Sequence, residues 1–213
     1  MSLLSKRALI FNLIFLQSIF GKRKNHYIVN CFFILIGSLS LALSSQYKVP
    51  IGPVPITLQS LVVMLIGLLY GWRLGAATVI AYWCEGIAVG SLFFAIPWFA
   101  NGSGFSYFVS APSAGFLWGF LPMVVLTGLL LNDCAWKNSF LKACGALILG
   151  QGALYFCGIF YGYLFVLPVV DWMNSTSELF AIFMFPYLFG DALKTLIVAL
   201  LTVQLVRVSS FKG

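Results

Sequence analysis

The sequence contains very few charged residues for its length. Only 8% of its 213 residues are Asp, Glu, Lys or Arg, whereas 62% are hydrophobic. Soluble domains are about 25% charged, so this chain cannot cover a surface that faces water, and lipid must replace much of that water. Because a spanning helix needs about 20 apolar residues, a chain of this length has room for about six such helices.

The residue patterns of most enzymes are also absent. The chain has no GxxxxGK[ST] loop for nucleotide phosphates, no HExxH pair and no cluster of metal ligands. Its one histidine, His26, lies in the basic N-terminal region and cannot complete a Ser-His-Asp triad inside a membrane. The five cysteines form no CxxC pair, so neither a disulfide framework nor a zinc site is expected. We predict no catalytic residue, no metal and no cofactor.

The charges that are present are mostly positive, with a net charge of +7. A basic protein can bind nucleic acid, but here Lys and Arg stand at the ends of apolar segments, as the positive-inside rule describes. With the N-terminus inside, ten cations fall in inside segments, Lys48 falls outside, and Lys194 lies within a predicted span. The chain is therefore predicted to be a multi-pass protein of the cytoplasmic membrane with both termini in the cytoplasm.

Six long apolar segments follow the N-terminal region. They cover residues 27–45, 56–72, 74–96, 112–131, 141–167 and 180–207. Residues 8–20 are apolar but short and flanked by basic residues, which predicts an interfacial helix. The predicted fold is an all-α integral membrane protein with six transmembrane helices. We divide it into a basic N-terminal region with the interfacial helix, 1–26, and a six-helix substrate-binding domain, 27–213.

Small residues recur at four-residue spacing, which allows helix backbones to approach closely in lipid. The pairs are Gly67 with Gly71 and Gly75, Gly86 with Gly90, Gly115 with Gly119, and Gly158 with Gly162. The last segment is expected to begin its main helix near Pro186 after a short lead-in, because proline fits the first turn of a helix.

A few ionisable residues stand in apolar surroundings. Asp191 and Lys194, in FGDALKTLIVALL, are three residues apart and share a helix face. Such groups usually face the protein interior and mark a functional site; the alternative is a pair that neutralises itself and only packs the bundle. Glu85, in AYWCEG, could be a ligand group, a proton carrier or a hydrogen-bonded structural carboxyl, and the sequence leaves these three open.

Two loops have the character of a ligand site. VPIGPVPITLQ, residues 49–59, has three prolines within six positions and cannot begin a helix smoothly, and its apolar character predicts a buried lid rather than a connector. IPWFANGSGFSYF, residues 96–108, combines Trp98 and Asn101 with glycines and other aromatic residues. Such a surface suits a small organic ligand with a polar head.

These segments together resemble the BioY family, the biotin-binding S components of energy-coupling-factor (ECF) transporters. The matching pieces, in family order over about 145 residues, are PIGPVPITLQSLVVMLIGLLYG (50–71), AYWCEG (81–86), FANG (99–102), APSAGFLWGF (111–120), YFCG (155–158) and GDALK (190–194). The resemblance implies six helices, a cytoplasmic N-terminus and a biotin site near the extracytoplasmic side.

The resemblance also implies binding residues. Asp191 and Lys194 match the family's binding stretch, and Asn101 is the candidate for an Asn that follows the third helix, although the loop here is longer and either SLFFA or IPWFA can be the counterpart. Asp191 can accept from a ureido N–H, Lys194 can donate to a carbonyl or carboxylate, and Asn101 can do both. The remaining candidates are Glu85 and Gln59, with Trp98, Tyr155 and Tyr163 as walls for an apolar ring.

The function implied is high-affinity biotin binding and uptake as the substrate-specific subunit of an ECF-type importer. The transmembrane coupling subunit and the ATPase subunits must then be separate proteins, and Ser38 and Ala42 are expected to dock on the coupling subunit. The alternatives are an S component for a different vitamin, a solitary transporter driven by protons through Glu85 or Asp191, and a membrane enzyme, which lacks a nucleophile–base pair. No nucleic-acid partner is expected.

Overall fold

The computed structural model describes residues 26–50, 54–92, 97–133, 136, 139–169 and 175–210. Most of these residues are helical: α2 (His26–Gln46), α3 (Gln59–Leu92), α4 (Gly104–Ser110), α5 (Ala114–Asn132), α7 (Phe140–Tyr161) with its π-helical continuation η1 (Gly162–Val166), α8 (Thr176–Phe183) and α9 (Phe185–Ser210). Two short strands, β1 (Lys48–Val49) and β2 (Ile56–Thr57), pair in antiparallel fashion. The interfacial helix expected at 8–20 lies outside the described residues.

Five of the described helical stretches are long and apolar enough to cross a membrane. They account for all six predicted segments, because α3 covers both 56–72 and 74–96. No loop separates those two segments. Instead α3 leaves helical geometry at Gly71, whose φ of 73° lies in the left-handed region that glycine adopts without strain. The chain is thus a multi-pass membrane protein in which α3 consists of two helices that fold back on each other at Gly71, since a Cβ on Gly75 would lie only 3.4 Å from the side chain of Ile66.

The last predicted segment is divided as the sequence suggested. A short helix, α8, ends at Phe183, and Met184 departs from helical geometry with φ −129° and ψ −58°. The main helix, α9, begins at Phe185, which puts Pro186 in its first turn. Because proline has no N–H to contribute, its place there costs no helical hydrogen bond.

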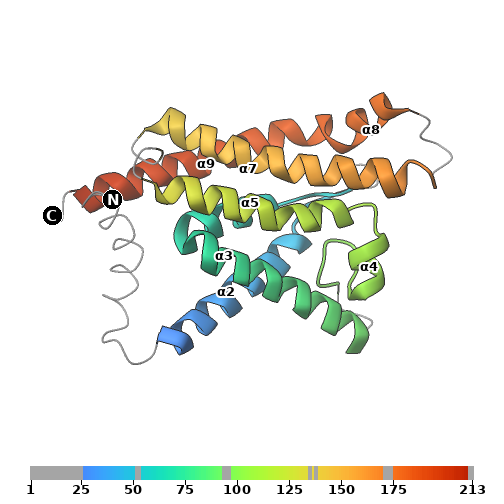
Figure 1. The fold of residues 1–213 in the computed structure, drawn as a ribbon, viewed down its shortest axis with the longest axis horizontal. Coiled ribbons are helices and arrows are strands. Elements are labelled where there is room, and N and C mark those ends of the chain that lie inside the picture. The colour runs from blue at the N-terminus through green and yellow to red at the C-terminus, as the bar shows by residue number, and fades with distance from the viewer. Residues whose placement is uncertain are drawn as a thin grey trace.

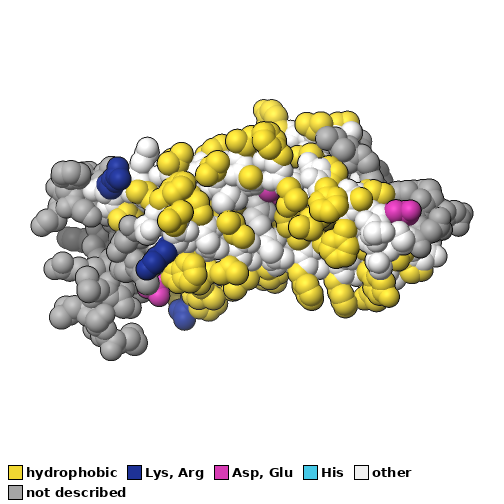
Figure 2. Space-filling view, turned by 90° about the horizontal axis from the view of Figure 1, so that it is seen from above, with side chains coloured by type: hydrophobic (Ala, Val, Ile, Leu, Met, Phe, Trp, Pro, Cys, Tyr) yellow, Lys and Arg dark blue, Asp and Glu magenta, His cyan; other side chains and the backbone are white. Residues whose placement is uncertain are grey.

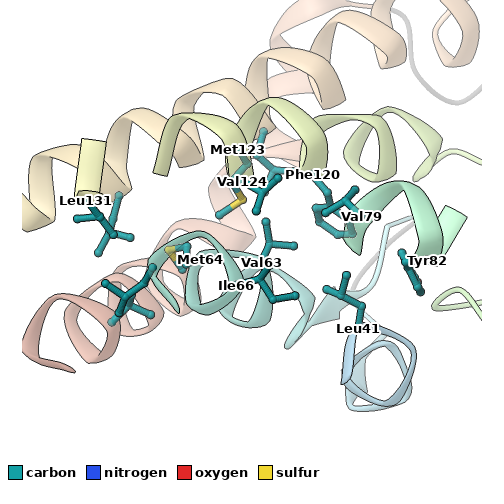
Figure 3. Close-up of a cluster of buried hydrophobic side chains, with 14 of the residues drawn as sticks. Leu41, Val63, Met64, Ile66, Val79, Tyr82, Phe120, Met123, Val124 and Leu131 are labelled. Carbon is teal, nitrogen blue, oxygen red and sulfur yellow. The ribbon is translucent and has the colours of Figure 1, made fainter. Parts of the chain in front are cut away.

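The long helices pack in sequence across the molecule (Figure 1). α5 lies between α7 on one side and α3 on the other, α2 crosses α3 on the far side, and α9 packs against both α7 and α3. Buried apolar side chains join these layers (Figure 3): Leu41 comes from α2, Val63 and Val79 from the two parts of α3, and Met123 from α5. In lipid, van der Waals packing of this kind holds helices together.

Apolar side chains are also exposed on the outside. Leu39, Phe156 and Leu200 are each about half exposed or more, at 48%, 70% and 54%. Figure 2 shows hydrophobic side chains over the middle of the molecule and the Lys and Arg side chains of that face toward one end. Soluble proteins rarely expose so large an apolar surface, whereas lipid tails cover it at no cost.

The glycine pairs do provide close packing, though not always between helices. A Cβ on Gly119 would lie 3.0–3.1 Å from Leu154 of α7, as expected for a helix contact. A Cβ on Gly86 or Gly90 would instead collide with Phe99 or with the backbone of Gly104, both outside the long helices. The lack of a side chain at Gly86 and Gly90 therefore allows the loop that follows α3 to pack closely against this helix.

The expectation that Ser38 and Ala42 dock on a partner subunit is wrong. Ser38 is fully buried and Ala42 is 8% exposed. The small-residue face of α2 is turned toward α3, since a Cβ on neighbouring Gly37 would meet Tyr70 and Thr78 at 3.0 Å or less. Because this chain uses that face for its own packing, the face is not available to another protein.

Candidate functional site

A cavity with about 580 Å³ of empty space, its open mouth included, lies among the β1–β2 hairpin, α3, α5, α7 and α9. Most of the lining is apolar or aromatic, and the polar side chains come mainly from the start of α3, the middle of α7 and the first half of α9. This composition suits a small, largely apolar ligand with one polar part.

Asp191 and Lys194 form an ion pair in the wall of this cavity. The Nζ of Lys194 lies 2.8 Å from Oδ1 of Asp191, and each residue is 8% exposed. The positions three apart on α9 put both side chains on one face of the helix. Charges this deeply buried require partners, and the surroundings provide them.

Hydrogen bonds from three other elements complete the pair. Lys194 donates to the backbone carbonyl of Thr57 in β2, at 2.8 Å, and to Oγ of Ser60 in α3, at 2.9 Å. Asp191 accepts from Oγ of Ser60, at 3.1 Å, and from the phenol of Tyr155 in α7, at 2.5 Å. The network thus links the hairpin, α3, α7 and α9, and it presents the carboxylate of Asp191 to a ligand as an acceptor.

Aromatic side chains form the apolar side of the cavity. The ring of Phe116 on α5 lies edge-on to Tyr155 and tilted to Tyr187, with centroids 6.3 Å apart in both cases. Leu117, Phe120 and Leu154 extend this surface. Such a corner can hold a flat or puckered apolar ring beside the polar network.

The second half of the proline-rich segment lines the cavity. Residues 54–57 line it, and Val54 is only 5% exposed. The phenol of Tyr187 on α9 donates a 2.5 Å hydrogen bond to the carbonyl of Val54, and the short ladder of β1 and β2 holds the base of the segment. Residues 54–57 are therefore part of the cavity wall, as the sequence predicted for the whole segment, whereas Val49 at its start is 56% exposed.

Four of the predicted site residues meet at the cavity, namely Asp191, Lys194, Tyr155 and Gln59. Gln59 is 3% exposed, and its Nε2 donates to the phenol of Tyr82 at 2.7 Å. Tyr82 donates in turn to the carbonyl of Trp98 at 3.3 Å. Gln59 therefore connects the cavity wall to the loop after α3.

The other four predicted residues are not among those that line the cavity. Trp98 contributes its carbonyl to the loop's hydrogen bonds, and Glu85 accepts a 2.8 Å hydrogen bond from Ser38 of α2. Tyr163 lies in η1 and is 51% exposed. Asn101 is exposed next to the lining residue Ala100, and its Oδ1 accepts from Lys48 at 2.8 Å.

Several lining residues were not anticipated from the sequence. Thr57 takes part through its backbone carbonyl and Ser60 through a common hydroxyl, so neither gives a signal in the sequence. Tyr187 does give one, because it stands four and seven residues before Asp191 and Lys194 and so shares their helix face.

Together, these features define a multi-pass membrane protein with an internal, largely apolar cavity that holds one buried ion pair. The sequence profile of the BioY family matches residues 21–211, nearly the whole chain. The chain belongs to the BioY family.

Individual relatives agree with this assignment. The chain is 26% identical over 165 residues to the biotin transporter BioY of Thermotoga maritima. The aligned region covers 78% of this chain and 88% of the relative. The chain is 34% identical over 171 residues to the biotin transporter BioY of Rhodobacter capsulatus, covering 78% and 86%. A solved structure of the S-component for biotin from an ECF-type ABC transporter superposes with a TM-score of 0.69, covers 88% and 95%, and shares 19% identity. That likeness shows a common fold.

Proposed function

We propose that this chain binds biotin with high affinity and serves as the substrate-specific subunit of an ECF-type importer in the cytoplasmic membrane. The observation that carries the proposal is the buried Asp191–Lys194 pair in the wall of a largely apolar cavity. Membership of the BioY family supports the choice of ligand, as do the relatives described as biotin transporters.

The chemistry of biotin matches the cavity. Its ureido head has two N–H donors and one carbonyl acceptor, its sulfur-containing ring is apolar, and its tail is an anion at neutral pH. Asp191 can accept a hydrogen bond from a ureido N–H, because the bond from Tyr155 occupies one lone pair of its Oδ2 and leaves the other open. Phe116 and Tyr187 would pack against the ring, where the cavity is aromatic. The tail would then extend toward the mouth of the cavity.

The energy for uptake would come from other proteins. The sequence has no nucleotide-binding loop, so we propose that separate ATPase subunits and a transmembrane coupling subunit assemble with this chain, which has no enzymatic activity of its own. Tilting of the whole S component would carry the bound vitamin inward. Since the small-residue face of α2 is buried, the coupling subunit would bind elsewhere on the lipid-facing surface.

For the topology, we propose six membrane crossings with both termini in the cytoplasm and the cavity near the outer side. In this arrangement the first part of α3, Gln59–Tyr70, is one crossing. Twelve residues of helix span about 18 Å, which is less than the hydrocarbon core of about 30 Å. The hairpin before it would complete the crossing, which explains why that segment is apolar. The substrate-binding domain would comprise residues 27–213, preceded by the basic region 1–26.

A direct titration of the purified chain with biotin tests the proposal. We expect saturable binding to the chain alone, competition by unlabelled biotin but not by other vitamins, and no ATP hydrolysis. Tight binding of a different vitamin would point to another S-component specificity. Uptake by the chain alone in proteoliposomes, driven by a pH gradient, would instead establish a solitary proton-coupled carrier.

A further inference from the structure

A lysine lies beside the wall of the cavity. Lys48, in β1, donates from Nζ to the backbone carbonyl of Ala100 and, at 2.8 Å, to Oδ1 of Asn101. Ala100 lines the cavity and is 6% exposed, so the ammonium group of Lys48 is one hydrogen bond away from the cavity wall. Both of these partners are uncharged, and Lys48 takes part in no ion pair among the described residues.

The cavity itself offers no net positive charge. Its charged lining residues are Asp191 and Lys194, which neutralise each other across 2.8 Å. An anionic ligand that leaves water for this site needs a counter-charge, because an unpaired buried charge is very unfavourable. The counter-charge must therefore come from a cation other than Lys194, or from Lys194 after its ion pair with Asp191 has been broken.

Lys194 is poorly suited to this role. An ammonium group has three N–H donors, and Lys194 already uses three, on Thr57, Ser60 and Asp191. Lys48 uses two, on Ala100 and Asn101, and so has one donor to spare. Because Oδ1 of Asn101 is occupied by Lys48, Asn101 presents its amide nitrogen as a second donor at the same place.

We infer that Lys48, assisted by Asn101, is the anchor for the carboxylate of the ligand's tail, while the Asp191–Lys194 network receives the polar head. This inference rests on the proposed function, and it gives the ligand a direction, head inward and tail at the mouth. The charge pattern assigns Lys48 to the outer side of the membrane, where the cavity is proposed to lie. The other described cations outside the cavity, Arg73, Lys142 and Arg207, stand at positions that the same pattern assigns to the cytoplasmic side.

The test compares biotin with its primary amide, which keeps the shape of the tail and removes its charge. Both are titrated against the purified full chain. The wild-type chain should prefer the acid by about tenfold, the worth of one hydrogen bond between charged groups. Lys48→Met should remove that preference, and Lys48→Arg should retain most of it. Lys142→Met removes a cation from an exposed position on α7 and should leave the preference unchanged.

Other results overturn the inference in distinguishable ways. If Lys48→Met weakens the binding of the acid and of the amide equally, Lys48 only connects the hairpin to the loop at Ala100 and does not bind the carboxylate. If the wild-type chain binds acid and amide equally, or if Lys194→Met alone abolishes the preference in a protein that still melts cooperatively, the carboxylate is held elsewhere. A wild-type chain that binds neither compound rejects the proposed function, and the inference with it.

Discussion

The phenol of Tyr155 on α7 donates a 2.5 Å hydrogen bond to Oδ2 of Asp191 on α9, so that two helices distant in sequence share one buried polar contact. The contact orients the carboxylate whose other oxygen is held by Lys194 and Ser60. We expect Tyr155→Phe to weaken biotin binding by about tenfold, since a hydrogen bond to a charged group contributes about 1.5–3 kcal/mol. A binding titration measures the change.

Tyr161→Phe is the matched control for that variant. Tyr161 lies on the same helix, is equally buried and also donates through its phenol, but its acceptor is the carbonyl of Val109 and it is not among the residues that line the cavity. The two variants should lose similar stability, and only Tyr155→Phe should lose affinity. Equal affinities in both would mean that Tyr155 packs the bundle without orienting the site.

The lid provides a second prediction. A single cysteine at Ile56, which lines the cavity from β2, should react with a maleimide more slowly when biotin is bound. The five native cysteines are first replaced by alanine. Ser177→Cys, on the exposed first turn of α8, serves as the control whose labelling rate should not change. Identical rates at Ile56 with and without saturating biotin would leave the hairpin as a static wall.

The sequence predicted the helices well because their signals are local. Residues 27–45 and 112–131 became α2 and α5 with ends shifted by one or two positions, since long apolar runs bounded by polar or loop residues define a span. The break at Gly71 was predicted as a helix end one residue further on, at residue 72. α4 was not predicted, because seven residues with Gly104 at the start carry no helical periodicity.

The site was only partly predictable, because it depends on contacts between distant segments. Asp191 and Lys194 were evident, since ionisable residues inside a membrane helix are energetically costly and usually mark a functional site. Asn101 and Glu85 were equally conspicuous, yet their side chains meet Lys48 and Ser38. Packing decides which neighbour a polar side chain meets. The loop that carries Asn101, for example, can approach α3 closely only because Gly86 and Gly90 have no side chain.

That close approach gives a third prediction. A Cβ at Gly90 would lie 2.0 Å from the backbone nitrogen of Gly104, so Gly90→Ala must displace the loop after α3. Overpacking of this kind costs about 1–3 kcal/mol, and we expect a Tm lower by several degrees together with weaker biotin binding, because Ala100 of the same loop lines the cavity. Gly152→Ala, where a Cβ meets nothing within 4 Å, should leave both unchanged.

The charge asymmetry predicts the orientation in the membrane. A reporter fused after Gly213 should be active in the cytoplasm, and a tag inserted at Ser177 should be accessible from outside. The reason is that Lys and Arg residues gather in the segments assigned to the inside. An external C-terminus would contradict both the orientation and an even number of crossings.

The buried pair gives the most decisive prediction. Asp191→Asn keeps the shape of the side chain and removes its charge, and Lys194→Met removes the partner's charge. Either change alone leaves an unpaired buried charge, which typically destabilises by about 3–5 kcal/mol, so a loss of binding in a single variant is ambiguous. The double variant has no net change in charge, and we expect it to melt cooperatively near the wild-type Tm.

Biotin binding by that folded double variant decides what the pair is for. If Asp191 and Lys194 only pack the bundle, the double variant should bind with nearly wild-type affinity, since Phe116, Tyr187 and the hairpin remain in place. If the pair receives the ureido head, the variant should bind at least tenfold to a hundredfold more weakly, because a hydrogen bond to a charged group is lost. We expect the second result. Wild-type affinity, measured by titration on a sample whose folding is confirmed by its melt, would refute the assignment of the site.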